Sequence, residues 1–424
     1  MKADIVIVGT GVSGLYCALN LPTDKKIIMV TKSKAEESDS FLAQGGICVL
    51  KNEEDYDSFF EDTMKAGHYE NNKKSVDIMI RSSRDVVNDL EKYGARFTKE
   101  NGEFVYTKEG AHSNKRILYH EDVTGKEITS HLLATVRKCE NITLIEEFTM
   151  VDILCQNDSC CGIIGFDKKH EYQTIEADYT VLATGGIGGL YENSTNYSHL
   201  TGDALAVALK HQVDLQNISY IQIHPTTLYS KEKGRRFLIS ESVRGEGAIL
   251  LNDKKERFVD ELLPRDVVTE AIQKEMEKEH TSHVWLSLEN IPEEVIRTHF
   301  PNIYERCLKE GYDAAKECIP VVPSQHYFMG GIKVDEWSKT SMDRLYAVGE
   351  TACNGVHGKN RLASNSLLES LVFAKRAALH MVENYSEICY TKKTDVNAEE
   401  YQDYQGKYKA AVLLEIEKEK ESHE

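Results

Sequence analysis

Residues 5–14 decide the fold, and they read Ile5-Val6-Ile7-Val8-Gly9-Thr10-Gly11-Val12-Ser13-Gly14. Four apolar residues in a row are typical of a parallel strand that is buried on both faces. The glycines have the spacing Gly-x-Gly-x-x-Gly, and the mostly apolar segment 15–19 predicts a helix directly after them. A strand, a glycine-rich turn and a helix bring backbone N–H groups to a pyrophosphate. The stretch therefore predicts a Rossmann-like dinucleotide site.

The second predicted strand, residues 27–30, departs from the usual dinucleotide pattern. An Asp or Glu at its end would bind ribose hydroxyls, but Thr31-Lys32-Ser33 follows here. Two alternatives to an ordinary dinucleotide site stay open at this point. The first is a Rossmann half without a nucleotide, and the second is bound NADP with Lys32 on its 2′-phosphate.

A second glycine motif follows some thirty residues later, where the chain reads Ser40-Phe41-Leu42-Ala43-Gln44-Gly45-Gly46. Two adjacent glycines let the backbone approach a flat ring system closely, because there is no Cβ in the way. The motif therefore indicates a cofactor with a planar ring.

Composition and charge restrict the class of protein. The 424 residues are 41% hydrophobic and 28% charged, as expected for a globular enzyme of two or three domains. A net charge of −18 disfavours nucleic acid and anionic membranes as partners. The ten cysteines include no C-x-x-C pair, so we expect neither a zinc site nor an iron–sulfur site. No apolar run is long enough for a membrane helix, and a strand starting at Asp4 leaves no room for a signal peptide, so we expect a cytoplasmic protein.

The order of predicted elements gives an α/β fold class with a split domain. Residues 1–220 read as the first part of a Rossmann-like domain, with an antiparallel insertion at 151–166 and a strand at 179–183. Residues 221–325 read as an inserted α+β capping domain with helices at 271–280 and 293–299. Residues 326–388 return to α/β, with a strand at 344–348 and a helix from Ser364 to about 384. We expect Ser366 and Glu369 to form a capping box there, residues 389–424 to form a short helical tail, and the substrate to lie between the two domains.

Six segments, in this order, carry a resemblance to a known family. They are 9–14, 40–46, 183–186, 224–247 (His-Pro-Thr through Glu-Ser-Val-Arg-Gly-Glu-Gly), 263–267 (Leu-Pro-Arg-Asp-Val) and 325–369 (Gln-His through His-Gly-x-Asn-Arg to Ser-Asn-Ser-Leu-Leu-Glu). Over residues 1–385 the chain resembles the L-aspartate oxidases, within the succinate dehydrogenase/fumarate reductase flavoprotein superfamily. Members usually carry a longer C-terminal helical domain, so a reduced version of it is expected here.

The resemblance implies that the cofactor is FAD, bound in extended form. In the relatives that bind FAD covalently, a His stands five residues before the Gln of the Gln-Gly-Gly motif; here that residue is Asp39, so we expect noncovalent FAD. The resemblance assigns the segment 184–186 to the adenosine side, and Asp203 and Glu350 to ribityl or ribose hydroxyls. The full set of implied FAD-binding residues is Gly9, Gly11, Ser13, Gly14, Thr31, Lys32, Ser40, Ala43, Gln44, Gly45, Gly46, Ala183, Thr184, Gly185, Asp203, Glu350, Asn365, Ser366 and Leu367.

The resemblance also implies a dicarboxylate site. It places the side chains of His224, Ser240, His326 and Arg361 around the substrate carboxylates. It places Arg265 nearest the reacting carbons, either as a proton donor or as a fixed charge that orients and stabilises the substrate. We expect Glu109 to select the substrate amine, and no metal to take part.

Each of these residues also has a purely structural interpretation. The two histidines could be satisfied turn or core residues, and the arginines could be ion-pair partners, as Arg265 is close to Asp260, Glu261 and Asp266 in the sequence. Glu109 could be a surface glutamate beside Lys108.

The activity that the resemblance implies is oxidation of L-aspartate to iminoaspartate, by hydride transfer to flavin N5. Oxygen or fumarate would reoxidise the flavin, and the reaction would be the first step of de novo NAD synthesis, with quinolinate synthase as a possible partner. Three alternatives remain open. They are a soluble fumarate reductase, the flavoprotein subunit of a succinate dehydrogenase or fumarate reductase complex, and a flavin-binding scaffold without turnover.

Overall fold

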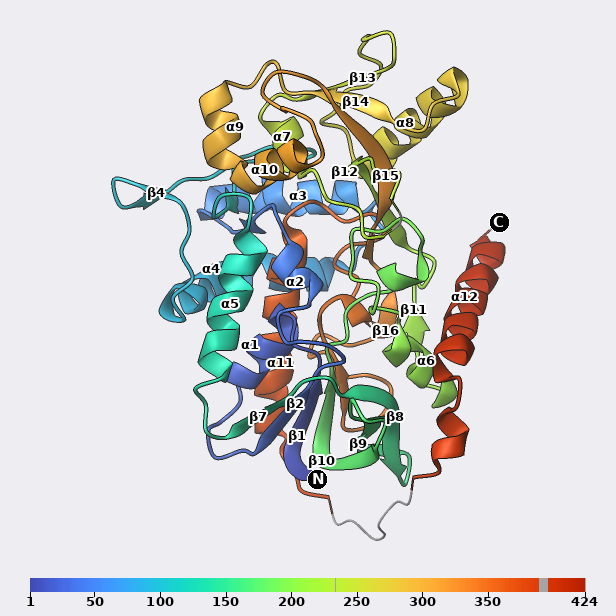
Figure 1. Ribbon diagram of the computed structural model, residues 1–424. Helices are drawn as coiled ribbons and strands as arrows, with labels where there is room; N and C mark the ends of the chain where they lie inside the picture. The colour runs from blue at the N-terminus through green and yellow to red at the C-terminus, as the bar shows by residue number, and fades with distance from the viewer. Residues whose placement is uncertain (233, 389–395, 424) are drawn as a thin grey trace.

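The computed structural model describes residues 1–232, 234–388 and 396–423. Its lower half in Figure 1 is built on a seven-stranded sheet with the order β7-β2-β1-β10-β9-β8, in which β17 also pairs with β10. The strands are β1 (Lys2–Val8), β2 (Ile27–Val30), β7 (Ile142–Ile145), β8 (Thr149–Gln156), β9 (Ser159–Phe166), β10 (Tyr172–Leu182) and β17 (Leu345–Ala347). The pairs β7–β2, β2–β1, β1–β10 and β10–β17 are parallel. The pairs β10–β9 and β9–β8 are antiparallel. The predicted strands and the antiparallel insertion are confirmed.

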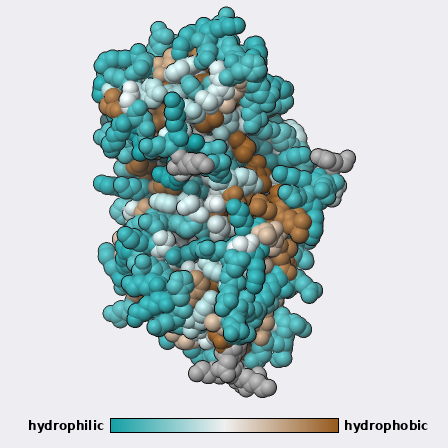
Figure 2. Space-filling model, turned by 45° about the vertical axis from the view of Figure 1, so that its right-hand side comes forward, coloured by the Kyte–Doolittle hydropathy of each residue, from teal (hydrophilic) through white to brown (hydrophobic). Residues whose placement is uncertain are grey.

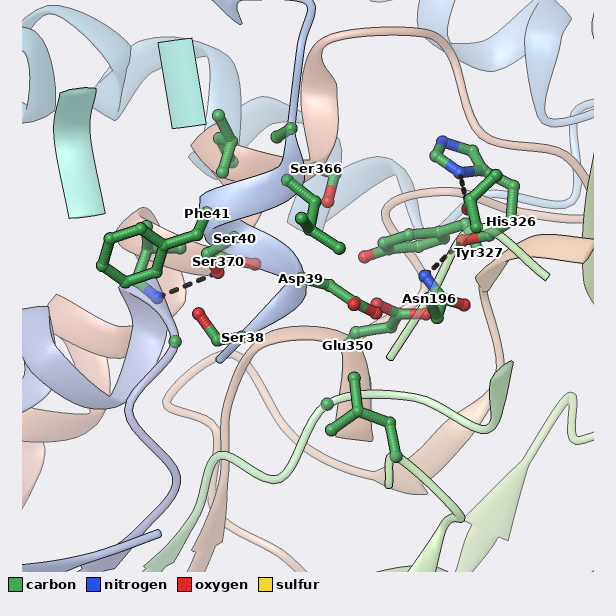
Figure 3. Close-up of a pocket in the computed structure, with 18 of the residues that line it drawn as sticks. Ser38, Asp39, Ser40, Phe41, Asn196, His326, Tyr327, Glu350, Ser366 and Ser370 are labelled. Carbon is green, nitrogen blue, oxygen red and sulfur yellow. Dashed lines mark hydrogen bonds between the residues drawn. The ribbon is translucent and has the colours of Figure 1, made fainter. Parts of the chain in front are cut away.

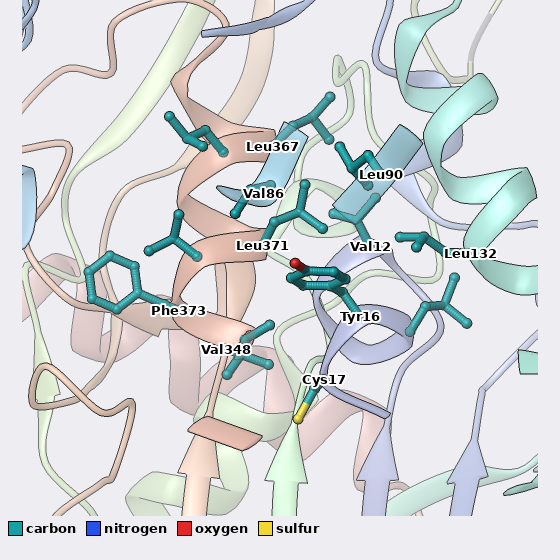
Figure 4. Close-up of a cluster of buried hydrophobic side chains, with 14 of the residues drawn as sticks. Val12, Tyr16, Cys17, Val86, Leu90, Leu132, Val348, Leu367, Leu371 and Phe373 are labelled. Atoms are coloured by element: carbon teal, nitrogen blue, oxygen red, sulfur yellow. The ribbon is translucent and has the colours of Figure 1, made fainter. Parts of the chain in front are cut away.

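Helix α1 (Val12–Leu19) follows β1 directly and is packed on all sides. Its neighbours are α4 (Lys73–Lys92), α5 (Thr124–Val136) and α11 (Asn365–Glu383). Figure 4 shows Tyr16 of α1 among apolar side chains from these helices, and Tyr16 is fully buried. A short helix becomes stable in this way because its burial removes apolar surface from water.

The glycines of the first motif allow β1, α1 and β10 to approach closely. A Cβ on Gly9, whose φ is +117°, would lie 2.0 Å from the carbonyl oxygen of Ala183, and one on Gly14 would lie 2.3 Å from that of Gly9. Neither position accepts a side chain, so both glycines are required by the turn and by helix–strand packing.

The upper half in Figure 1 is a cap built on a four-stranded antiparallel sheet with the order β12-β15-β14-β13. Its strands are β12 (Ile221–Leu228), β13 (Ile249–Leu251), β14 (Val284–Ser287) and β15 (Ile319–Phe328), and its helices are α7 (Glu241–Gly245), α8 (Arg265–Glu279), α9 (Glu293–His299) and α10 (Pro301–Lys309). The predicted domain boundary at 325 falls inside β15, because this strand pairs with β12 as far as Phe328. Helix α8 begins at Arg265, six residues before the predicted start, because Pro264 stands at its N-cap.

The remaining elements connect the two halves or lie at the edge. The strands are β3 (Ile47–Cys48), β4 (Lys99–Glu100), β5 (Glu103–Phe104), β6 (Ile117–Leu118), β11 (Leu215–Gln216), β16 (Gly331–Lys333) and β18 (Ala352–Cys353). The helices are α2 (Asp39–Leu42), α3 (Tyr56–Ala66), α6 (Asp203–Lys210) and α12 (Tyr404–His423), with short 3₁₀ turns at Glu53–Asp55, Gly188–Leu190, Gly349–Thr351 and Ala398–Tyr401.

The tail packs on the body as predicted, within the part that the structure describes. Val412 and Ile416 of α12 are buried in the core cluster that contains α6, while Tyr401 and Tyr404 pack against β8 and β9. Residues 389–395 of the predicted tail lie outside the described residues. Among the described helices, none is long and apolar enough to cross a membrane. Figure 2 shows a face that is mostly hydrophilic, with hydrophobic residues gathered near its middle.

The predicted capping box at Ser366 and Glu369 is wrong. Helix α11 begins at Asn365, and its N-cap is Ser364, two residues before the predicted cap Ser366; Ser364 has a left-handed backbone (φ +60°) and no side-chain capping bond. The Ser364 hydroxyl instead donates to Glu109, and the Glu369 carboxylate accepts from Asn354. Tertiary contacts therefore take the groups that a local capping box would use.

Candidate active site

A long cavity passes between the lower sheet and the cap, and its two ends have different chemistry. One end lies at the carboxyl ends of β1, β2 and β10, where the first glycine motif, Lys32 and the segment 183–185 meet. The other end lies under the cap and collects charged and histidine side chains. Ligands of open α/β sheets bind at the carboxyl ends of the strands, so the first end suits a nucleotide.

Most of the predicted cofactor residues line this cavity. They are Gly9, Gly11, Ser13, Thr31, Lys32, Ser40, Ala43, Gln44, Gly45, Gly46, Ala183, Thr184, Gly185, Asp203, Glu350, Ser366 and Leu367. Gly14 and Asn365 lie behind the wall. Gly14 serves the packing of α1, and the Asn365 amide donates to Thr63 Oγ1 at 3.1 Å.

The polar lining fits a flavin dinucleotide. Several buried oxygens along the wall have no partner among the described residues: Ser38 Oγ, Asp39 Oδ2 and Gln44 Oε1. Buried polar groups normally have hydrogen-bond partners, so unpartnered ones on a cavity wall indicate a polar ligand.

Lys32 is already neutralised by the protein. Its Nζ lies 2.7 Å from Asp203 Oδ2 and 3.0 Å from the carbonyl oxygen of His199, with Thr201 Oγ1 at 3.2 Å. An ammonium group has three donors, and these three oxygens use them all. This arrangement argues against the alternative in which Lys32 binds the 2′-phosphate of NADP.

Asp39 and Glu350 face each other across the middle of the cavity. Figure 3 shows their carboxyl groups pointing toward one another, with Asn196 and Tyr327 close by. Asp39 accepts a hydrogen bond from the backbone of Tyr197 at 3.0 Å, and Glu350 accepts one from that of Phe328 at 2.9 Å. Burial raises the pKa of both carboxyls, and the charge of Asp39 raises that of Glu350 further. Such carboxyls are suited to hydrogen bonding with ligand hydroxyls.

The N-terminus of α11 points at the cavity between its two ends. Ser364, Ser366, Leu367 and Ser370, from the N-cap and the first two turns, line the wall. A helix of 19 residues carries a partial positive charge at its N-terminus. A ligand group that gains negative charge is stabilised at this place.

Two histidines form the first part of the substrate end. The rings of His224 (β12) and His326 (β15) meet edge to face with their centroids 5.1 Å apart. Thr195 Oγ1 lies 2.7 Å from His326 Nδ1, which fixes that ring, and His224 Nε2 has no partner among the described residues. Burial lowers the pKa of both histidines well below the ordinary range, and the charge of Arg265 lowers them further. Both rings are therefore neutral at pH 7.

Arg265 stands at the first position of α8 and is held by two partners. Its Nε lies 2.5 Å from Glu241 Oε2, and its Nη1 lies 2.8 Å from Gln222 Oε1. Glu241 is also 3.5 Å from Arg244 Nη2. Burial alone would raise the pKa of Glu241, but the two arginines outweigh it and lower that pKa, so Glu241 is a carboxylate.

Arg361 is buried with few partners of its own. Its guanidinium lies 4.4 Å from the centroid of the Tyr327 ring, and its Nε has no hydrogen-bond partner among the described residues. Burial lowers its pKa to about 10, and Arg265 contributes in the same direction. A buried guanidinium with an unpartnered donor favours an anionic ligand, because the anion replaces the hydrogen bonds that water would otherwise accept from it.

Glu109 is not on the surface. Its side chain is 4% exposed and lines the cavity, and its two oxygens accept hydrogen bonds from Ser242 Oγ at 2.7 Å and Ser364 Oγ at 2.5 Å. Burial raises the pKa of Glu109, and the charge of Glu241 adds to this. The substrate end therefore presents the carboxyl group of Glu109, in addition to that of Glu241, beside the cationic side chains.

The sequence neighbours of Arg265 are paired elsewhere: Asp266 with His68, at 2.8 Å, and Glu261 with Arg257. Arg265 is instead the ion-pair partner of Glu241, so it has a structural contact as well as a place in the cavity lining. The predicted residues His224, Ser240, Arg265, His326, Arg361 and Glu109 all line the same cavity.

Sequence reasoning missed the residues that hold this set in place: Gln222, Glu241, Arg244 and Thr195. A signal existed for Gln222, because it precedes His224 by two residues on β12 and strand residues two apart share a face. Glu241 and Arg244 belong to the segment Glu-Ser-Val-Arg-Gly-Glu-Gly at 241–247, but no local pattern in the sequence shows that Glu241 pairs with Arg265. No group of His, Cys, Asp and Glu within the described ranges could hold a metal ion.

The comparisons with known proteins agree with this geometry. A family model described as FAD binding domain matches residues 4–367. An L-aspartate oxidase of Clostridium perfringens is 53% identical over 380 residues, covering 89% of this chain and 86% of the relative. One of Clostridium acetobutylicum is 49% identical over 397 residues, covering 93% and 91%.

Solved structures show the same fold. An Escherichia coli quinol fumarate reductase has a TM-score of 0.85 at 28% identity, covering 99% of this chain and 74% of that chain. A quinol-fumarate reductase structure with menaquinol molecules gives 0.87 at 29%, covering 98% and 75%. The FAD-binding flavoprotein fold expected from the sequence is thereby shown, and the Rossmann half without a nucleotide is excluded.

Proposed function

This chain belongs to the L-aspartate oxidases, an FAD-binding family, and on this premise we propose how its cavity performs the reaction: it oxidises L-aspartate to iminoaspartate. When bound, FAD supplies the hydride acceptor at N5. The protein's own side chains hold the dicarboxylate, keep its Cα–H oriented and recognise its amine.

The balance of charge in the cavity is the observation that carries the proposal. At the substrate end, Arg265 and Arg361 in the wall and Arg244 behind Glu241 oppose Glu241 and, in our assignment, an ionised Glu109, while the histidines are neutral. This group of side chains carries one net positive charge. L-Aspartate carries one net negative charge at neutral pH, since its ammonium offsets one of its two carboxylates. A plain dicarboxylate such as succinate carries two and would leave an uncompensated charge in a buried site, which is costly.

We assign the contacts accordingly. His224, His326 and Arg361 hold the carboxylates, with Ser240 beside them, and Glu109 takes the amine. Arg265 is fixed by Glu241 and Gln222 and acts first as an oriented positive charge, because a guanidinium rarely gives up its proton. Proton transfer by Arg265 is the second role that we consider.

A soluble fumarate reductase is the second candidate function. The same arginines and histidines would hold fumarate, and the fold likeness to quinol fumarate reductases supports this candidate. The difference lies in Glu109, which a dicarboxylate without an amine does not need and which repels it.

The test is anaerobic mixing of the purified yellow protein with L-aspartate, watching the flavin absorbance. We expect bleaching with L-aspartate and none with D-aspartate or succinate. Bleaching by succinate but not by L-aspartate would favour the fumarate reductase alternative, and no bleaching by any of them would contradict both.

We further propose that FAD is held noncovalently, because Asp39 stands where the flavin-linking His would be. Acid precipitation should then release all FAD to the supernatant. Flavin that stays in the denatured pellet would contradict this assignment. It would favour the alternative in which the chain is the flavoprotein subunit of a succinate dehydrogenase or fumarate reductase complex.

The remaining expectations extend from the activity. We propose oxygen or fumarate as the electron acceptor, a place in the first step of de novo NAD synthesis in the cytoplasm, and quinolinate synthase as the enzyme that consumes the product. Coupled assays with each acceptor, and with added quinolinate synthase, would test these points.

A further inference from the structure

A cysteine and an aspartate of β8 lie in a row with a histidine at the end of α6, and none of the three lines the cavity. Cys155 Sγ is 3.5 Å from His211 Nδ1, and His211 Nε2 is 2.6 Å from Asp152 Oδ1. Cys155 is exposed, His211 is half-buried and Asp152 is buried. In this order, the carboxylate can orient the histidine, and the histidine can activate the thiol.

The pairing of β8 with β9 is irregular beside the sulfur. Asp152 and Cys155 are three residues apart, so in a regular strand they would point to opposite faces. The register shifts between Leu154 and Cys155, where β9 has one extra residue, Cys161, and such a bulge increases the local twist of the pair. His211 comes from the C-cap of α6, which packs against β8 (Figure 1).

The carboxylate of Asp152 is fixed from both sides. Its Oδ2 accepts hydrogen bonds from Lys210 Nζ at 2.6 Å and Tyr401 OH at 2.9 Å, and Lys210 also pairs with Glu400. These donors hold Asp152 ionised and oriented toward His211.

The imidazole is consequently cationic. Hydrogen bonding to Asp152, and then to Cys155, raises the pKa of His211 to about 9. The C-terminal end of α6 favours a cation at the same place. A protonated His211 directs Nδ1–H at the sulfur, so a cation stands beside the group that would react. Across the hairpin, burial raises the pKa of Cys160 to about 12, so that neighbour remains a thiol.

We propose that Cys155 is a thiol modification site, activated by His211 and Asp152, that reacts with hydroperoxides. The Cys155 thiolate attacks one peroxide oxygen, an S–O bond forms and the O–O bond breaks. Sulfur is oxidised to the sulfenic acid, the peroxide is reduced, and the leaving oxygen takes the proton from His211 Nδ1 to give water or an alcohol. The site is separate from aspartate oxidation, so Cys155→Ser leaves turnover unchanged.

The first measurement uses the wild-type holoenzyme and iodoacetamide, with alkylation followed peptide by peptide. N-acetylcysteine serves as the reference for pH dependence, and half-buried Cys318 is followed as a second protein thiol. A free thiol gains roughly tenfold in thiolate per pH unit below its pKa, so the rate of N-acetylcysteine should rise more than about tenfold from pH 6.5 to 8. We expect the Cys155 rate to change less than about twofold. A Cys155 rate that rises in parallel with that of N-acetylcysteine overturns the proposal.

Variants then identify the activating group. His211→Gln should slow Cys155 alkylation at pH 6.5 by at least about tenfold. His131→Gln is the matched control, because His131 is a half-buried histidine on α5 that pairs with Glu127 and not with this cluster, and it should keep the fast reaction. An unchanged rate in a folded, FAD-loaded His211→Gln protein overturns the assignment.

Hydrogen peroxide with dimedone as a sulfenic acid trap tests the class of electrophile. The adduct should appear on the Cys155 peptide before the Cys318 peptide and be delayed in His211→Gln. Adducts that form equally on both peptides overturn the hydroperoxide assignment.

Discussion

At the scale of single residues, Glu109 separates the two candidate functions. Its carboxyl is held by hydroxyl groups of Ser242 and Ser364, and a glutamine of the same shape can keep these contacts. Glu109→Gln removes the charge that recognises the amine, and a hydrogen bond to a charged group contributes roughly 1.5–3 kcal/mol. We expect the ratio of kcat/KM for aspartate oxidation to that for fumarate reduction to fall by about ten- to a hundred-fold.

The control for this change is Glu103→Gln, an exposed glutamate on β5. It should leave the ratio unchanged. If Glu109→Gln also leaves the ratio unchanged, Glu109 does not select the amine, and the charge balance proposed for the cavity is wrong.

Arg265 is the second residue whose role can be isolated. Its planar fork binds Glu241 and Gln222 together, and lysine keeps the charge but loses the fork. Arg265→Lys should therefore lower turnover with aspartate by orders of magnitude while the FAD content stays near full. Arg257→Lys, at an exposed arginine that pairs with buried Glu261, is the matched control and should retain activity. Near-normal turnover in Arg265→Lys would mean that Arg265 is only a structural partner.

At the scale of elements, the adjacent glycines before β3 have different neighbours. A Cβ on Gly46 would lie 2.3 Å from Ile117 Cγ2 and from the carbonyl oxygen of Leu118, so it would push β3 away from β6. A Cβ on Gly45 would lie 2.7 Å from Glu109 Oε1, at the movable end of a side chain. The sequence explained both glycines by a flat ring, but the protein's own packing also requires Gly46.

The two alanine variants should therefore fail in different ways. Gly46→Ala should lower the free energy of unfolding by about 1–3 kcal/mol, as overpacking does. Gly45→Ala should keep most of that stability but lower kcat/KM for aspartate, because it displaces Glu109. Urea unfolding and steady-state kinetics on both variants would decide, and equal losses of stability would contradict this distinction.

Local sequence patterns predicted the helices and strands better than they predicted the residues that hold the site in place, such as Gln222 and Glu241. The run 5–14 specifies a strand, a turn and a helix because all its determinants are within ten residues. The contact of Arg265 with Glu241 and Gln222 joins α8, α7 and β12, and no period in the sequence shows it. The capping box failed for a related reason: Ser364 adopts a left-handed backbone to reach Glu109, which is 255 residues away in the sequence.

At the scale of the whole molecule, buried neutral histidines make stability depend on pH. His112 is 7% exposed; its Nδ1 accepts from Arg116 Nη1 at 3.1 Å, and its Nε2 then donates to the carbonyl oxygen of Ala363 at 3.1 Å. Burial lowers the pKa of His112 to about 4, and the charge of Arg116 contributes. The burial of His224 and His357 lowers their pKa values as well.

The direction of this pH effect follows from comparing the protonation of the histidines in the folded and the unfolded protein. Below about pH 6.5 these histidines take up protons in the unfolded chain, whereas in the folded protein they do not. Their contribution to stability is therefore complete above that pH and is lost as the pH falls. For His112 the loss continues down to about pH 4. Each histidine can remove at most about 1.4 kcal/mol per pH unit, so the loss from pH 7 to 5 should be about 2 kcal/mol for His112 alone.

Buried carboxyls act in the opposite direction over the same range, because Asp39 and Glu350 have raised pKa values and take up protons in the folded protein. The test therefore compares variants. His112→Gln can keep both hydrogen bonds through its amide but cannot titrate, so the free energy of unfolding lost between pH 7 and pH 5 should be about 2 kcal/mol smaller than in the wild type. His170→Gln, at an exposed position, controls for the loss of a histidine as such. If His112→Gln and His170→Gln show the same pH dependence as the wild type, His112 does not stay neutral in the folded protein. The loop that carries Glu109 would then not be held by the Arg116–His112–Ala363 chain, and the aspartate site would need another support.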